Sequence, residues 1–250
     1  MAFALTLLAA AHLGGAEPAA PVSQPEALYA DGRYVEAADA CSDQSDADCF
    51  AIAARATLVG GYFEADQDAC IEAAKRAEDF AREALKRDPD HVEGHVQLGL
   101  ALGRRGAEIA AVKAHLLRLA PRSRNHIERA VELDPQNAWG LAALGGWHLE
   151  VVRRGGARVY GASVDEGVAA FERALALAPE NPAIAYQFGL RLAGLDDPEL
   201  DARARAAFAR AAAGAPVSEI ERLLKADAPA AAAALDLEGD ARAFVLASRL

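Results

Sequence analysis

Aromatic and β-branched residues are scarce in this 250-residue chain, and their scarcity argues against a β-sheet protein. Phe, Trp and Tyr make up 6% of the residues, whereas apolar residues, mostly Ala and Leu, make up 53%. Ala and Leu are strong helix formers, while strands favour aromatic and β-branched side chains. The length suffices for a sizeable core in one or two domains. We therefore expect an all-α protein.

Cysteine is also sparse, and its spacing excludes the common cysteine motifs. Cys41, Cys49 and Cys70 form no C-x-x-C pair, so neither a zinc site nor a dithiol redox motif is expected, and no cofactor is predicted. In an exported protein we expect one disulfide and one free thiol. Cys41–Cys49, across the polar loop CSDQSDADC, is the first choice, and Cys49–Cys70 stays open. In a reducing compartment all three would be buried thiols.

Long apolar runs are missing after the N-terminus. Residues 3–13 form an apolar stretch that is too short to cross a bilayer, and a signal peptidase could cut after Gly14-Gly15-Ala16. A basic segment before this stretch is missing, so a short hydrophobic helix is the alternative. We expect residues 1–16 to be a signal peptide, the mature chain to have no membrane span, and the protein to be periplasmic. Without export it would be cytoplasmic.

Positive charge is in the minority overall, but not in the middle of the chain. The net charge of −11 excludes a general nucleic-acid binder. Residues 101–160 differ, because they hold 10 Lys and Arg against 5 Asp and Glu. Three interpretations remain: solvated helix faces, neutralisation of the acidic flanks, or a site for an acidic or anionic partner.

Catalytic motifs are missing as well. The chain has no G-x-S-x-G or H-E-x-x-H sequence, and its acidic loop lacks the residue order of a calcium site. His91 and His95 have the spacing of metal ligands without a third ligand, so no metal site is predicted. A hydrolase using His148 and Glu150 is a remote alternative to a buried, packed histidine. We expect no enzymatic activity.

Internal repeats are the main feature that the sequence does have. Three stretches align without gaps: DPDHVEGHVQLGLAL (88–102), DPQNAWGLAALGGWH (134–148) and APENPAIAYQFGLRL (178–192). Each has a Pro in second place and a Gly after an apolar residue, and each follows a helical segment such as IERAVEL. Because Pro cannot continue a helix, each unit reads as a helix, a turn and a second helix with Gly at its middle.

This pattern resembles tetratricopeptide repeats (TPRs) across residues 70–214. The repeated Pro residues are 46, 44 and then 37 residues apart, against about 34 in the standard unit. The extra residues must fall between helix A and helix B of a repeat, near 104–123 and at 153–163. The resemblance implies an antiparallel helix-pair solenoid, a TPR-like superhelix with expanded A–B turns. We expect N-terminal helical repeats at 17–88, repeats with insertions at 89–214, and capping helices or a tail at 215–250.

A second resemblance covers residues 90–195. The helix with Leu144-Gly145-Gly146-Trp147, the inserted segment with its glycines, and the Tyr160-Gly161-Ala162 turn are similar to the TPR-like region of regulator of microtubule dynamics proteins. The chain also resembles exported bacterial TPR proteins. Both resemblances imply a fold and a binding role rather than a reaction.

The TPR resemblance also implies where a partner would bind. Such arrays bind on the concave face, which the A helices line, and aromatic side chains among a few charges are typical anchors. The predicted groove consists of Glu93, Val96, Leu100, Arg104, Trp139, Ala142, Leu149, Glu150, Tyr186 and Leu190. The predicted basic rim consists of Arg105, Arg153, Arg154 and Arg158, joined by Arg122 and Arg124. For Trp139, packing in the core is the alternative.

The sequence thus predicts a non-enzymatic scaffold or adaptor in the cell envelope. It would bind a protein or peptide segment, acidic or anionic in one interpretation, on its concave face, and it would not bind nucleic acid. The alternative is a ligand-binding accessory component of a solute transporter. The identity of the partner and the oligomeric state stay open.

Overall fold

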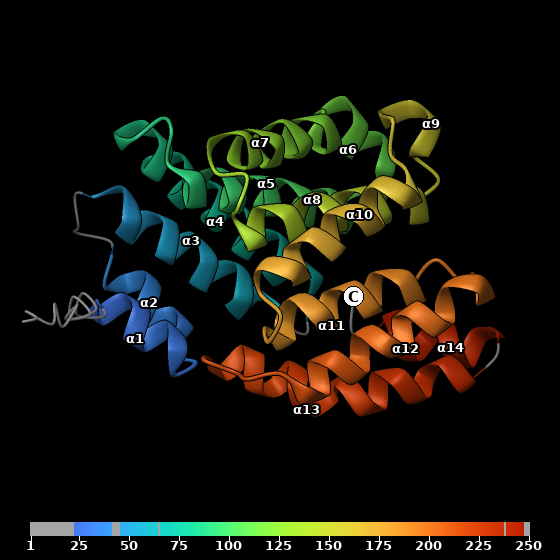
Figure 1. Ribbon diagram of the computed structural model, residues 1–250. Helices are drawn as coiled ribbons and strands as arrows, with labels where there is room; N and C mark the ends of the chain where they lie inside the picture. Colours follow the sequence, from blue (N-terminus) through green and yellow to red (C-terminus); the bar gives the residue numbers. More distant parts are fainter. Residues whose placement is uncertain (1–22, 42–45, 65, 238, 248–250) are drawn as a thin grey trace, which may run out of the picture.

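The computed structural model describes residues 23–41, 46–64, 66–237 and 239–247, and the predicted signal peptide lies outside them. Within these ranges the chain is helical and has no strand (Figure 1). No helix among them combines the length and the apolarity needed to span a bilayer. The helices are α1 (Gln24–Ala30), α2 (Tyr34–Asp39), α3 (Ala47–Gly61), α4 (Gln67–Arg87), α5 (Val92–Glu108), α6 (Ala111–Leu116), α7 (Leu119–Leu133), α8 (Ala138–Arg153), α9 (Ala157–Tyr160), α10 (Val164–Leu177), α11 (Pro182–Ala193), α12 (Pro198–Ala213), α13 (Glu219–Ala233) and α14 (Gly239–Ala247), with a 3-10 turn at Ala234–Asp236.

The helices pack as consecutive pairs, which confirms the predicted solenoid. The pairs are α3 with α4, α5 with α7, α8 with α10, and α11 with α12. The first helices of neighbouring pairs also contact one another, from α3 through α5 and α8 to α11, more extensively than the second helices do. The array therefore curves with the first helices, the A helices, on its inner side.

The aligned glycines explain how closely each pair packs. A Cβ atom on Gly99 would lie 2.5 Å from Ile127 of α7, and one on Gly145 would lie 2.5 Å from the Phe171 ring of α10. On Gly189 it would lie 2.9 Å from Phe208 of α12. In each repeat the missing side chain lets a large apolar residue of helix B reach the backbone of helix A.

The start of each long A helix is fixed by an aligned cap. His91 Nδ1, Asn137 Oδ1 and Asn181 Oδ1 accept the backbone N–H groups of Gly94, Gly140 and Ile184 at 2.8–2.9 Å. These bonds satisfy donors that the first helical turn leaves unpaired. The Pro turns and these caps together separate helix B of one repeat from helix A of the next.

Both expanded turns contain a short extra helix. α6 lies between α5 and α7, and α9 lies between α8 and α10, so the insertions fall between helix A and helix B as predicted. Neither α6 nor α9 contains a buried residue. These helices therefore add surface rather than core.

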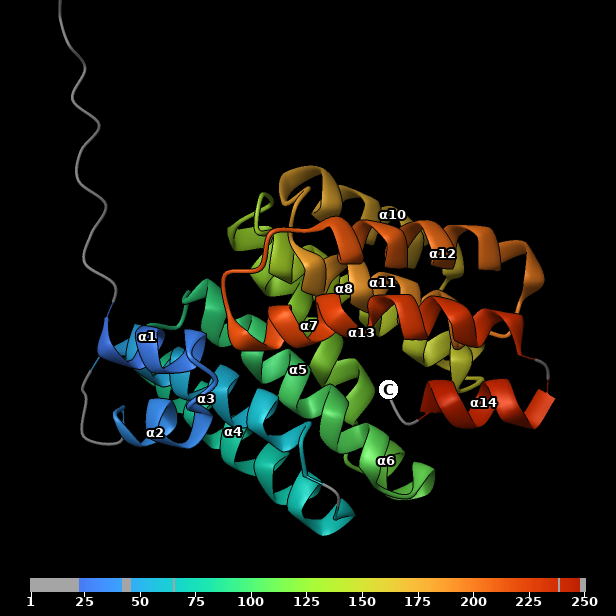
Figure 2. The ribbon, with the colours of Figure 1, turned by 90° about the horizontal axis from the view of Figure 1, so that it is seen from below.

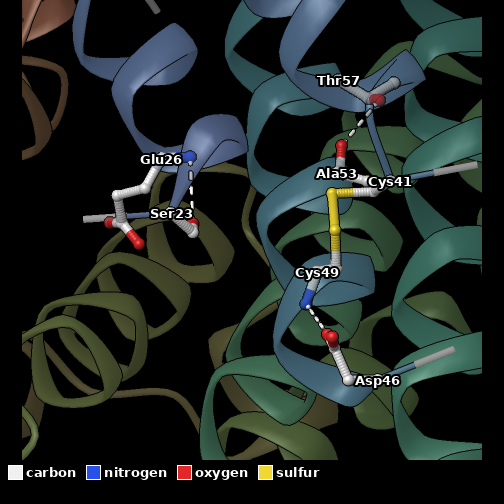
Figure 3. Close-up of a disulfide and its surroundings, with 7 residues drawn as sticks. All are labelled: Ser23, Glu26, Cys41, Asp46, Cys49, Ala53 and Thr57. Carbon is white, nitrogen blue, oxygen red and sulfur yellow. Dashed lines mark hydrogen bonds between the residues drawn. A yellow bond between two sulfur atoms is a disulfide. The ribbon is translucent and has the colours of Figure 1, made fainter. Parts of the chain in front are cut away.

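A disulfide joins the first two helix pairs, as predicted. Cys41, after α2, is bonded to Cys49 in the first turn of α3, with the two Cα atoms 5.3 Å apart (Figure 3). Asp46 caps the same turn by accepting the N–H of Cys49 at 2.7 Å. Cys70 is a buried free thiol, so the alternative pairing Cys49–Cys70 is wrong.

The C-terminal segment forms α13 and α14, and α13 reaches back to the start of the array. α13 packs on α11 and α12 as the next A helix would, and its first turn lies beside α1 (Figure 2). Arg222 donates to the Ala30 carbonyl at 3.4 Å, and Ile220 packs against the apolar cluster around Tyr34. The two ends of the described array therefore touch across the inner side.

Candidate functional site

Five predicted groove residues do not line a groove, and the prediction is wrong for them. Val96, Leu149 and Leu190 are fully buried, and Ala142 and Tyr186 are buried as well. Val96 shares a core cluster with Ile127 of α7. Tyr186 stacks edge-on against Phe208 and donates its hydroxyl to Asp227 of α13.

The physical reason is the position of these residues at the contacts between helices of the same repeat and of neighbouring repeats. The inward register of a regular TPR superhelix assumes an open inner face. Here Val96 packs with Ile127 of α7, Leu149 packs beside Gly167 of α10, and α13 covers part of α11. The side chains therefore hold the repeats together instead of meeting a partner.

Two predicted groove residues remain accessible. Trp139, in the first turn of α8, is 42% exposed, and Leu100 of α5 is 37% exposed. The alternative that Trp139 packs in the core is therefore wrong. The other tryptophan, Trp147, is only 6% exposed. An exposed indole is an apolar surface with a hydrogen-bond donor at its edge, which suits it to a contact with another molecule.

The charged residues of the inner face are held in ion pairs. Glu93, which has the same register position as Trp139, lies 3.7 Å from Arg55 of α3. Arg55 also binds Glu26 of α1 at 3.0 Å and lies over the ring of Tyr29, 4.5 Å from its centroid. Burial raises the pKa of the Tyr29 hydroxyl. This network connects α1, α3 and α5 and fixes the charges near the first turns of the A helices.

A second ionic cluster surrounds Glu150 near the end of α8. Its carboxylate binds Arg153 at 2.6 Å, Arg191 of α11 at 2.8 Å, and Arg154. Burial alone would raise the pKa of Glu150, but the hydrogen bond from Arg153 and the charge of Arg191 outweigh it and lower this pKa to about 2. Glu150 is therefore an anion that ties α8 to α11. Arg104, one turn before the end of α5, is paired with Glu108 in a similar way.

The predicted basic rim is mostly neutralised. Arg153 and Arg154 are paired with Glu150, and Arg105 binds the buried Glu78 at 2.7 Å. Arg158 of α9 differs, because it is exposed and makes no ion pair within the described part of the chain. Of the four predicted rim residues, Arg158 alone keeps its charge available.

His95 and His148 serve packing, and His91 serves capping. His148 is 3% exposed, and its Nδ1 accepts the N–H of Ser163 at 3.2 Å. Burial lowers its pKa. His95 donates from Nε2 to the Pro89 carbonyl at 3.0 Å, and its Nδ1 lies 3.0 Å from Nδ1 of His126. The described residues contain no group of three or more His, Cys, Asp or Glu side chains placed to hold a metal ion.

A recess of about 370 Å³, which could not be predicted from the sequence, lies beside the second expanded turn. Its lining includes Trp147 of α8, Val159 and Tyr160 of α9, and Arg124, Asn125 and Glu128 of α7. The gathering of glycines, arginines and aromatic residues at 144–163 was the one sequence feature that indicated a site here. The lining residues of α7 could not be added from sequence, because nothing local places α7 beside α9.

The comparisons with known proteins agree with this architecture. A family model described as regulator of microtubule dynamics protein 1-3 matches residues 27–228. Among solved structures, a thermophilic TPR protein of Thermus thermophilus superimposes with a TM-score of 0.61 and 19% sequence identity, over 84% of this chain and 97% of that chain. No curated protein matches the sequence. At this identity the structural likeness shows the fold alone, a TPR-like array of helices.

Proposed function

The chain belongs to the regulator of microtubule dynamics family, and from this premise we propose that it binds an extended segment of a partner protein on its inner face. The TPR-like fold suggests a protein-interaction scaffold. A curved array of helix pairs offers a long concave surface without requiring any residue to react.

The observation that carries the proposal is the exposure of Trp139. Large aromatic side chains contribute most to protein interfaces when they enter a desolvated contact. Trp139 is 42% exposed in the first turn of the A helix α8, and Leu100 adds apolar surface on the preceding A helix. Around them the ion pairs of Glu93 and Glu150 hold charges in fixed places. A partner would thus meet an apolar anchor between preorganised polar groups.

The proposal assigns no reaction to His148 or Glu150. The Nδ1 atom of His148 is occupied by the Ser163 N–H, and Glu150 is held as an anion by three arginines. A general acid or base needs a pKa near the working pH, whereas that of Glu150 is lowered to about 2. Both residues therefore have a structural role.

We place this function in the cell envelope. The Cys41–Cys49 disulfide supports the placement, because disulfides persist in oxidising compartments such as the periplasm and are rare in the reducing cytosol. Cell fractionation of the native protein tests it. Recovery in the periplasmic fraction is expected, and recovery in the cytosol with three reduced thiols would contradict it.

Affinity capture with matched variants tests the binding surface. Trp139→Ala removes the proposed anchor, and Leu177→Ala removes an apolar side chain of similar exposure, 45%, from the last residue of the B helix α10. Loss of a hot-spot tryptophan costs about 2 kcal/mol or more, a roughly thirtyfold loss of affinity. Partners recovered with wild type and Leu177→Ala should be depleted with Trp139→Ala. Equal recovery of partners with all three proteins would exclude the inner face around Trp139 as the binding surface.

A further inference from the structure

The two expanded turns meet and build one surface. His115, directly before the last residue of α6, lies 2.7 Å from the hydroxyl of Tyr160 at the end of α9 (ring nitrogen Nδ1 to Oη). Both helices lie at the same edge of the array in Figure 1. Because the standard repeat lacks these insertions, this surface is additional to the solenoid and separate from Trp139 on the inner face.

Large apolar side chains are left in solvent on this surface. Val112 and Leu116, one turn apart on α6, are 74% and 75% exposed, and Val159 on α9 is 67% exposed. Single exposed apolar residues are ordinary, but a group of them on two touching helices is typical of an interaction site. Because α6 and α9 contain no buried residue, these apolar side chains add no core packing to the isolated chain.

The cavity beside Tyr160 is preformed. The indole N–H of Trp147 donates to the Ala120 carbonyl at 2.9 Å, and the Arg124 guanidinium lies over the indole, 5.0 Å from the ring centroid. Arg124 is itself held by Glu128 at 2.7 Å and by the Tyr160 carbonyl at 3.1 Å. The aromatic wall is therefore fixed in place, and a recess of about 370 Å³ can receive one large apolar side chain.

Three cations in the two expanded turns have no ion-pair partner among the described residues. Lys113 on α6, Arg118 before α7 and Arg158 on α9 are all exposed, and none of them makes an ion pair within the described residues. Other arginines nearby, such as Arg124 and Arg154, have carboxylate partners. The three unpaired cations supply the complementarity that an acidic ligand would need.

We propose that the expanded turns form a second binding site, which takes an acidic segment of a partner protein. One aromatic or large aliphatic side chain of the segment enters the recess against Trp147 and Tyr160. Its flanking carboxylates pair with Lys113, Arg118 and Arg158. A recess of this size favours a single inserted side chain over a flat bilayer, and the net charge of −11 opposes docking on an anionic membrane.

Fluorescence of Trp147 tests this site directly. The chain has two tryptophans, so a Trp139→Phe background leaves Trp147 as the single indole, and the emission then reports on the recess alone. The probes are a synthetic peptide with a central Phe among Asp and Glu, the same peptide with Ser for Phe, the same peptide with Lys for the acids, and vesicles of phosphatidylserine and phosphatidylcholine.

The acidic Phe peptide is expected to change Trp147 emission at lower concentration than the other probes. Combined Lys113→Glu and Arg158→Glu should weaken its binding about tenfold, since two exposed attractions become repulsions. Arg173→Glu, an exposed cation of α10 without an ion pair among the described residues, should weaken it less than about twofold.

Three results would overturn the proposal. Equal binding of the Phe and Ser peptides would show that no side chain enters the recess. Equal binding by the charge-reversed and Arg173→Glu proteins would show that Lys113 and Arg158 do not bind the acidic residues. A response to vesicles but not to peptides would make the occupant a membrane. Because the emission comes from Trp147 alone, failure here leaves the inner-face function untouched.

Discussion

Substitution of two adjacent glycines in α8 should change stability in opposite directions. A Cβ on Gly145 would lie 2.5 Å from the buried Phe171 ring and 2.8 Å from the Gly167 carbonyl oxygen, which is backbone and cannot turn away. A Cβ on Gly146 would meet nothing closer than 3.9 Å. Replacing Gly by Ala in a helix gains about 1 kcal/mol of helix propensity, and overpacking a buried contact costs about 1–3 kcal/mol.

Gly145→Ala should therefore lower the free energy of unfolding by up to about 2 kcal/mol, or the Tm by up to about 4–8 °C for a chain of this size. Gly146→Ala should raise it by up to about 1 kcal/mol. Thermal and urea unfolding, followed by circular dichroism, measures both. If Gly145→Ala were as stable as Gly146→Ala, helices α8 and α10 would not approach at Gly145, and the repeat register would be refuted.

Three further perturbations test the disulfide, the histidines and Glu150. Reducing Cys41–Cys49 should cost about 2.5 kcal/mol for a loop of this length, measured by urea unfolding with and without reductant; three free thiols in oxidised, denatured protein would contradict the bond. The pKa of His126 is lowered to about 4, so the unfolded state binds more protons below pH 6.5, and stability should fall between pH 6.5 and 4. After discounting for the partial exposure of His126, His126→Gln should reduce this loss of stability by about 1–2 kcal/mol. An unchanged pH profile of stability would exclude His126 as its cause. Because the pKa of Glu150 is lowered to about 2, its contribution is present above pH 4.5 and is lost toward pH 2. Glu150→Gln should cost about 2–3 kcal/mol at pH 7 and less as the pH falls, and a cost independent of pH would show that its charge is not the cause.

The sequence predicted those features that repeat locally. The aligned Pro turns, the glycines at 99, 145 and 189 and the placement of both insertions follow from patterns within one repeat, and the structure shows each of them. The Cys41–Cys49 pairing was accessible for a similar reason, because it spans a short polar loop. Features that depend on residues close together in the sequence could therefore be predicted from it.

The burial of individual groove positions could not be predicted in the same way. Whether Tyr186 faces a partner or Phe208 depends on how α11 packs against α12, and on α13, which follows later in the chain. The same limit applies to Glu150, whose partner Arg191 is 41 residues away. Standard inward positions describe an open superhelix, and the contact of α13 with α1 changes the inner face.

The most direct test of the central claim, that partners bind on the inner face at Trp139, is site-specific photo-crosslinking in the native cells. A photoreactive phenylalanine analogue would replace Trp139 in one variant and Leu177 in another, and covalent adducts would be identified by mass spectrometry. We expect a defined partner segment to be joined at position 139 and to be missing at position 177. The same partner joined at position 177, with no adduct at position 139, would contradict it.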